Sequence, residues 1–117
     1  MALVIDDDPE LRAYIVRRLA PYYETREAGT CSVALDCLEE HVPDVILLDI
    51  GLPDTDGATF FHVIRSRPEW ANIPILLMTG FSLAMVFPGQ LPLRTAYLPK
   101  PFTSRSLLLA LEGLTEK

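Results

Sequence analysis

The sequence predicts an α/β protein, a three-layer α/β/α sandwich built around a parallel sheet. Four short apolar runs recur along the chain, and each ends abruptly at a polar residue. Amphipathic helical patterns separate these runs, and such alternation is typical of parallel strands joined by right-handed crossovers. The chain has 117 residues, half of them hydrophobic and 22% charged. We expect one domain, spanning residues 1–117.

The four apolar runs are the expected strands. They are rich in Val, Ile and Leu without polar interruption, a composition typical of strands covered on both faces. They occupy residues 2–5, 45–48, 75–78 and 96–98. A weaker fifth candidate lies at 22–28, where apolar and polar residues alternate as in an edge strand.

The segments between these runs favour helices. Over 9–19, an apolar stripe recurs every fourth residue, with Asp8 as the N-cap and Pro9 in the first turn. Helices are also expected over 30–41, where Val33, Ala34, Cys37 and Leu38 would share the buried face, and over 58–66, where Phe60 or Phe61 would be buried with Ile64. Thr103 or Ser104 would cap a last helix that ends near Leu114. A short helix is expected at 82–87, followed by an irregular stretch.

Charge and composition exclude several classes of protein. The formal net charge of −6 argues against direct binding to nucleic acid or to an anionic membrane. Residues 70–93 carry no charge, but Pro74, Pro88 and Pro92 interrupt them, so no membrane span is expected. Cys31 and Cys37 fit neither a disulfide framework nor a zinc spacing, and they indicate buried thiols in a reducing, cytoplasmic compartment.

Five polar side chains stand at or just beyond the carboxyl ends of the expected strands. They are Asp6, Asp7, Asp49, Thr79 and Lys100. The carboxyl ends of parallel strands meet at one edge of the sheet, so these groups are expected to converge. Three neighbouring carboxylates repel one another unless a cation lies among them, and hard oxygen ligands suit Mg²⁺. A lysine opposite them would meet a phosphoryl group, and a central carboxylate can act as the nucleophile toward phosphorus.

Four segments together resemble the receiver domain of bacterial two-component response regulators. They are Asp-Asp-Asp-Pro at 6–9, Asp-Ile-Gly-Leu-Pro-Asp-Thr-Asp-Gly at 49–57, Pro-Ile-Leu-Leu-Met-Thr-Gly at 74–80 and Tyr-Leu-Pro-Lys-Pro-Phe at 97–102. The resemblance covers essentially the whole chain. It implies a flavodoxin-like sheet of five parallel strands in the order 2-1-3-4-5.

The resemblance also implies a role for each site residue. Asp49 would be the phospho-acceptor, and Mg²⁺ would be bound by Asp7, Asp49 and the Gly51 carbonyl, with Asp6 acting through water. Lys100 would pair with the phosphoryl group, and its bond to Pro101 would be cis. Thr79 and Tyr97 would be the switch residues: the hydroxyl contacts the phosphoryl group, and the ring rotates into the space that this movement vacates.

The family function would be that of a phosphoacceptor switch rather than an enzyme with a separate substrate. A histidine kinase or a histidine phosphotransfer protein would supply the phosphoryl group, and the chain would catalyse only its own phosphorylation and dephosphorylation. The surface made by the short fourth helix, the fifth strand and the last helix would then change shape. A homodimer contact or an output domain would use the region 83–98.

The segment 82–94 departs from the family pattern, because residues 83–87 are apolar in succession. We expect an exposed apolar patch that contacts another protein; the alternative is a collapsed loop, with which the Tyr97 switch works differently or not at all. Two positions that adjust acyl-phosphate lifetime in the family hold Gly51 and Phe81, neither of which can orient an attacking water. A long-lived phospho-Asp49 is therefore expected.

Two other functions are compatible with parts of the pattern. In a haloacid-dehalogenase-type phosphatase, Asp6 would be the nucleophile and Asp8 the general acid. That family requires a further acidic motif after its lysine, and only Glu112 and Glu116 follow Lys100. The other alternative is a binding module that keeps the receiver fold but is no longer phosphorylated. The sequence leaves open the cognate kinase, the output and the choice between a stand-alone protein and a domain of a longer one.

Overall fold

The computed structural model describes residues 1–115 except 53, 55 and 81–92. Within these residues, the strands are β1 (Ala2–Ile5), β2 (Thr25–Ala28), β3 (Val45–Asp49), β4 (Ile75–Thr79) and β5 (Thr95–Pro99). The helices are α1 (Pro9–Leu19), α2 (Cys31–Glu40), α3 (Gly57–Ser66) and α4 (Ser104–Thr115). The short helix expected at 82–87, the apolar patch at 83–87 and Phe81 lie outside the described residues.

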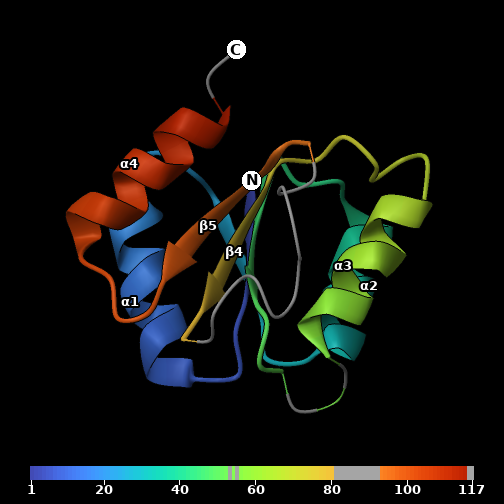
Figure 1. Ribbon diagram of the computed structural model, residues 1–117, viewed down its shortest axis with the longest axis horizontal. Coiled ribbons are helices and arrows are strands. Elements are labelled where there is room, and N and C mark those ends of the chain that lie inside the picture. Colours follow the sequence, from blue (N-terminus) through green and yellow to red (C-terminus); the bar gives the residue numbers. More distant parts are fainter. Residues whose placement is uncertain (53, 55, 81–92, 116–117) are drawn as a thin grey trace.

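The five strands form one parallel sheet in the order β2-β1-β3-β4-β5, which confirms the expected fold. In Figure 1, α1 and α4 lie on one side of the sheet, and α2 and α3 lie on the other. These are the three layers of an α/β/α sandwich. The three interior strands, β1, β3 and β4, are buried along their whole length, as their uninterrupted apolar sequences predict.

The alternation of side chains along each strand divides the core into two halves. Leu3 and Ile5 of β1 pack on the α2–α3 side, where the core also holds Phe60, Phe61, Ile64 and Trp70. Ala2 and Val4 pack on the other side, with Ile15 and Leu19 of α1 and Leu107 and Leu111 of α4. Each strand is therefore held from both faces, and this fixes the positions of the residues at its carboxyl end.

Side-chain caps begin the helices where the sequence predicts them. The Asp8 carboxylate accepts from the N–H groups of Glu10 and Leu11, with Pro9 in the first turn of α1. The Thr30 hydroxyl accepts from the Val33 N–H at the start of α2. Thr103 caps α4 through a reciprocal pair of bonds with Ser106.

Two details of the sequence prediction are wrong. Val33 does not share the buried face of α2 but is 45% exposed, because the stripe that meets the sheet is Cys31, Ala34 and Leu38. The edge strand is shorter than 22–28: β2 begins at Thr25, and Tyr22 is 66% exposed.

Cys31 is buried, Cys37 is half-buried and both are free thiols. None of the helices in the described part of the chain has the length and apolar character that a membrane span needs.

Candidate functional site

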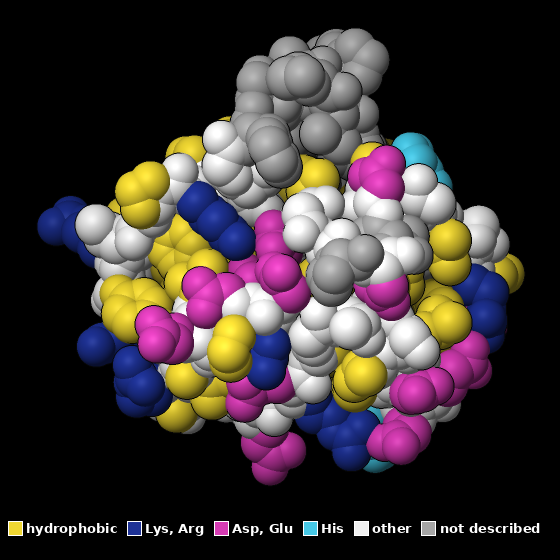
Figure 2. All heavy atoms as spheres, turned by 90° about the horizontal axis from the view of Figure 1, so that it is seen from below, with side chains coloured by type: hydrophobic (Ala, Val, Ile, Leu, Met, Phe, Trp, Pro, Cys, Tyr) yellow, Lys and Arg dark blue, Asp and Glu magenta, His cyan; other side chains and the backbone are white. Residues whose placement is uncertain are grey.

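The carboxyl ends of four strands bring the five predicted polar side chains to one edge of the sheet. Asp6 and Asp7 follow β1, and Asp49 and Thr79 are the last residues of β3 and β4. Lys100 follows β5. Figure 2 looks onto this end of the molecule and shows acidic side chains gathered near its centre, beside a basic one. The convergence predicted from the ends of the apolar runs is present.

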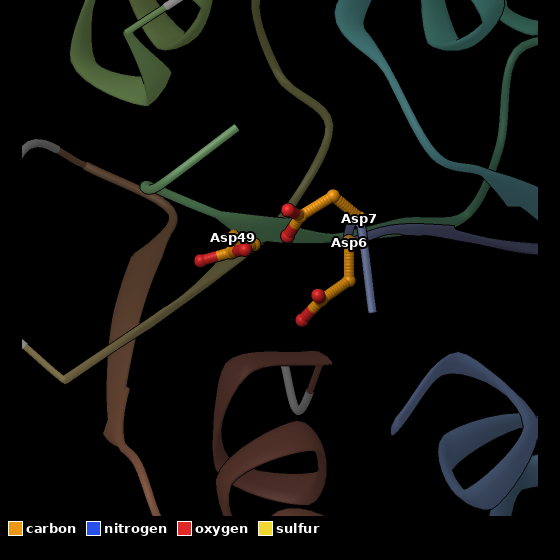
Figure 3. A group of neighbouring side chains, drawn as sticks. All are labelled: Asp6, Asp7 and Asp49. Atoms are coloured by element: carbon orange, nitrogen blue, oxygen red, sulfur yellow. The ribbon is translucent and has the colours of Figure 1, made fainter. Parts of the chain in front are cut away.

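Three carboxylates form the centre of the site. Asp6, Asp7 and Asp49 each offer one oxygen, and these three oxygens lie within 4.8 Å of one another. Asp6 and Asp49 are buried, whereas Asp7 is exposed. In Figure 3 the Asp7 side chain extends from the end of β1 toward Asp49, and the Asp6 side chain points toward the bottom of the view. Three oxygens of hard, anionic character at this spacing fit a divalent cation such as Mg²⁺.

Lys100 is the cation that the protein itself supplies. Its Nζ donates to Asp6 Oδ2 at 2.9 Å and lies 3.3 Å from Asp49 Oδ1. The peptide bond between Lys100 and Pro101 is cis, as predicted, and the Lys100 N–H donates to the Thr79 carbonyl at 2.9 Å. The backbone therefore fixes the lysine beside the end of β4, and its side chain bridges two of the three carboxylates.

The surroundings of Asp49 disfavour the ionised form of its carboxyl group. Burial raises the pKa of the Asp49 carboxyl, and the neighbouring Asp6 charge raises it further. The Gly51 N–H and the Lys100 ammonium act in the opposite direction without cancelling this effect. Burial alone would lower the pKa of Lys100, but its bond to Asp6 and the charges of both carboxylates outweigh burial and raise it. Lys100 is therefore a stable ammonium that compensates only part of the negative charge.

Backbone contacts hold Asp6 firmly. Its carboxylate also accepts from the Asp8 N–H at 2.9 Å, and its own N–H donates to the Ala28 carbonyl at 3.0 Å. The guanidinium of Arg12 donates to the Asp6 carbonyl at 2.7 Å and also pairs with Glu27. The sequence does not reveal this role of Arg12, because a basic residue on the polar side of a helix gives no sign of which carbonyl it reaches.

The loop after β3 is held close to the Asp49 carboxylate. The Gly51 N–H donates to Asp49 Oδ1 at 3.1 Å. Gly57 closes the loop: its N–H donates to the Ile50 carbonyl at 2.9 Å, and a Cβ at position 57 would lie only 2.4 Å from Ile50 Cα. The loop end therefore requires a residue without a side chain for reasons of space, which the sequence motif alone does not explain.

Thr79 and Tyr97 lie on neighbouring strands and share one face of the sheet. Tyr97 pairs in register with Leu77, two residues before Thr79, so alternation directs both side chains to the side of α2 and α3. Thr79 is buried and Tyr97 is half-buried. At the next residue, Gly80, a Cβ would have no atom of the described residues within 4 Å. The Thr79 hydroxyl thus stands at the end of β4, next to a residue without a side chain.

The position of Glu112 bears on the phosphatase alternative. Glu112 is exposed on α4 and lines a depression with Tyr22 and Tyr23, whereas the acidic site is lined by Asp6, Asp7, Asp49 and Lys100. Among the residues that the structure describes, no acid after Lys100 joins the group around Asp6. The further acidic motif of a haloacid-dehalogenase-type phosphatase is therefore missing from this part of the chain.

Comparisons with known proteins agree with this geometry. The family model described as the response regulator receiver domain matches residues 2–112. Protein Rrf1 of Nitratidesulfovibrio vulgaris is 32% identical over 111 residues, which cover 93% of this chain and 77% of Rrf1. A probable cyclic di-GMP phosphodiesterase of Vibrio cholerae is 35% identical over 80 residues, covering 68% of this chain. The solved structure of the chemotaxis response regulator CheY4 of Vibrio cholerae superposes with a TM-score of 0.84, at 26% identity, covering 97% of this chain and 96% of CheY4.

The relatives differ greatly in length. This chain spans 18% of the length of the probable phosphodiesterase and 34% of the transcriptional regulatory protein KdpE of Mycobacterium tuberculosis. It spans 8% of two histidine kinases. The same domain is thus shared by proteins with different remaining parts, and the activities of those whole proteins do not transfer to this chain.

Proposed function

This chain belongs to the response regulator receiver domain family, a signalling domain of two-component systems, and we propose that it acts as a phosphoacceptor switch with Asp49 as the acceptor. A phosphohistidine on a histidine kinase or a histidine phosphotransfer protein would be the donor. The observation that carries the proposal is the meeting of three carboxylate oxygens within 4.8 Å, with the Lys100 ammonium 3.3 Å from Asp49. Buried acidic groups that share one ammonium are costly to the fold and cluster at functional sites, which supports a site built for a bound cation.

The ligands proposed for Mg²⁺ are the carboxylates of Asp7 and Asp49 and the carbonyl of Gly51, with Asp6 acting through water. Asp6 already accepts hydrogen bonds from Lys100 and from the Asp8 N–H, which favours the indirect role. The exposed Asp7 has no such commitments among the described residues. When bound, the ion would neutralise negative charge on the incoming phosphoryl oxygens and on the acceptor.

The proposed transfer replaces a phosphorus–nitrogen bond by a phosphorus–oxygen bond. An Asp49 carboxylate oxygen attacks the phosphorus of the phosphohistidine, and the electron pair of the broken bond returns to the imidazole ring. The product on this chain is an acyl phosphate. Lys100 orients the carboxylate before transfer and pairs with a phosphoryl oxygen afterwards, because its ammonium is fixed beside both positions.

The proposed switch follows from the added charge. A phosphoryl group carries about −1.5 to −2 charges and three strong acceptor oxygens. The hydroxyl of Thr79 would donate to one of these oxygens, and the adjacent Gly80 has no side chain to obstruct this movement. Tyr97, on the neighbouring strand and the same face, would turn into the vacated volume. The surface 83–98, of which 93–98 is described, would then change its contact with a partner or output domain.

The test is phosphorylation with Mg²⁺ and acetyl phosphate, followed by intact mass. We expect the wild-type chain to gain one phosphoryl group and the Asp49→Asn variant to gain none. Asp56→Asn is the matched control, because Asp56 lies in the same loop but caps α3, and it should be labelled like the wild type. Labelling of Asp49→Asn would refute the acceptor. Continued release of phosphate over many turnovers would favour the phosphatase, and no labelling of any variant would favour a binding module.

A further inference from the structure

The loop that follows Asp49 is attached to a distant helix. We name residues 50–56 the acceptor loop. In its middle, the Asp54 carboxylate accepts from two N–H groups at the start of α2: from Cys31 at 3.0 Å and from Ser32 at 3.2 Å. These partners are 23 and 22 residues away in the sequence. The acceptor loop is thus hydrogen-bonded to the helix that follows the edge strand.

This attachment is unusual because α2 has its own cap. The first N–H groups of a helix have no partner within the helix, and the preceding residue commonly satisfies one of them. In α2, Thr30 takes the Val33 N–H at 3.2 Å, and Asp54 takes the two N–H groups before it. These N–H bonds lower the pKa of the Asp54 carboxyl, so it stays ionised at neutral pH.

The attachment is a third contact of the loop, between the contacts at its two ends. At one end the Gly51 N–H is bound to Asp49, and at the other the Gly57 N–H is bound to Ile50. Asp54 lies between these points, three residues after Gly51. We propose that Asp54 is a positioning residue, which ties the acceptor loop to α2 and thereby places the Gly51 carbonyl for Mg²⁺. This inference rests on the proposed function, because it assumes the Mg²⁺ site around Asp49.

A reciprocal effect must accompany this role. If the bonds from Asp54 to α2 favour the conformation that binds Mg²⁺, then Mg²⁺ strengthens those bonds by the same free energy. The Cys31 and Ser32 amides report the effect directly, because Asp54 is their acceptor. Their hydrogen exchange should slow on addition of Mg²⁺ in the wild type. In Asp54→Ala these two amides should exchange fast, with and without Mg²⁺.

The experiment is a Mg²⁺ titration of the full chain followed by NMR of the backbone amides, with hydrogen exchange on the same samples. For Asp54→Ala we expect the Mg²⁺ dissociation constant to rise roughly three- to tenfold, below the range of about 10–100-fold known for residues that contact a metal ligand directly. Asp54→Asn keeps one acceptor oxygen and should recover part of this loss. Thr30→Ala is the matched control, since it removes the other cap of the same helix and should leave Mg²⁺ affinity unchanged.

The outcomes separate the two proposals. Absence of Mg²⁺ binding in the wild type would overturn the proposed Mg²⁺ site, and with it this inference. Binding in the wild type with equal affinity in Asp54→Ala would overturn only the role of Asp54. A loss in Thr30→Ala as large as that in Asp54→Ala would also overturn it, because general weakening of α2 would then be the cause. The role of Asp54 would also be overturned if Mg²⁺ left the hydrogen exchange of the Cys31 and Ser32 amides unchanged.

Discussion

Gly57→Ala is the substitution whose effect the structure specifies most closely. Gly57 begins α3 and packs against the backbone of Ile50, the residue after Asp49. A Cβ at this position would lie 2.4 Å from Ile50 Cα, 2.7 Å from its carbonyl oxygen and 2.8 Å from its carbonyl carbon. All three are backbone atoms, so no side-chain rotation can relieve the overlap.

The size of the effect follows from how far the Ile50 backbone must move away from a Cβ at position 57. Carbon atoms in contact lie about 3.5–4.0 Å apart, so the loop and the helix must separate by about 1 Å or more. This movement strains the 2.9 Å bond from the Gly57 N–H to the Ile50 carbonyl. Overpacking of this kind costs about 1–3 kcal/mol, and the preference of helices for Ala over Gly returns at most about 1 kcal/mol. We expect a net loss of about 1–2 kcal/mol in the free energy of unfolding.

Urea and thermal unfolding of three proteins tests this reasoning. Gly57→Ala should melt roughly 4–8 °C below the wild type, given the usual unfolding entropy of a domain of this size. Gly113→Ala is the control, because Gly113 lies in α4 and a Cβ there would meet nothing within 4 Å. It should be neutral or stabilising by up to about 1 kcal/mol. Equal stability of Gly57→Ala and the wild type, or equal losses in both variants, would refute the argument.

Three further predictions concern the charges at the site. Lys100→Met leaves the buried Asp6 and Asp49 without their ammonium partner. In the absence of Mg²⁺ it should lower the free energy of unfolding by about 2–4 kcal/mol, as measured by urea unfolding. Added Mg²⁺ should then stabilise this variant more than it stabilises the wild type. Burial raises the pKa of Asp49 in the folded state, so the native chain binds more protons than the unfolded one and stability falls as pH rises through that window. The free energy of unfolding of Asp49→Asn should therefore rise relative to that of the wild type as the pH increases from about 4 to 7, as measured by urea unfolding without Mg²⁺. A difference between the two proteins that stays constant over this range would contradict the prediction. Finally, Gly51 and Phe81 predict that phospho-Asp49 persists well beyond seconds without a phosphatase, as the loss of label after removal of donor would measure.

The residues that converge at the site were predictable because each follows a local signal. An uninterrupted apolar run predicts a strand covered on both faces, and the first polar residue after it marks the carboxyl end. Parallel pairing then brings Asp6, Asp49 and Lys100 together whatever the details of the helices. The sequence resemblance supplied the strand order, which the apolar pattern alone leaves open.

The contacts that the sequence did not predict are those between residues that no sequence pattern connects. Asp54 stands in a loop rich in turn-forming residues, where a turn explains it fully, and nothing in the sequence pairs it with the start of α2. Val33 was misplaced for a different reason. The apolar stripe of α2 was centred one residue too far along, because Cys31 at the first position is a weak apolar signal that nevertheless packs against the sheet.

The charge balance of the site connects stability with signalling. Three carboxylates and one ammonium leave the site with two negative charges in excess, which a divalent cation would neutralise. The proposed phosphorylation of Asp49 would exchange a carboxylate of one charge for a group of up to two, so the loaded site would again hold negative charge without a compensating cation. Lys100, which contacts Asp6 and Asp49, compensates only one of these charges even when it pairs with a phosphoryl oxygen, so a further hydrogen-bond donor is expected to contribute. Among the five converging groups Thr79 is the other one whose side chain can donate, and no atom of the described residues would lie within 4 Å of a Cβ at the adjacent Gly80. The same excess charge that destabilises the resting fold is therefore the force expected to draw Thr79 toward the phosphoryl group and to start the change at Tyr97.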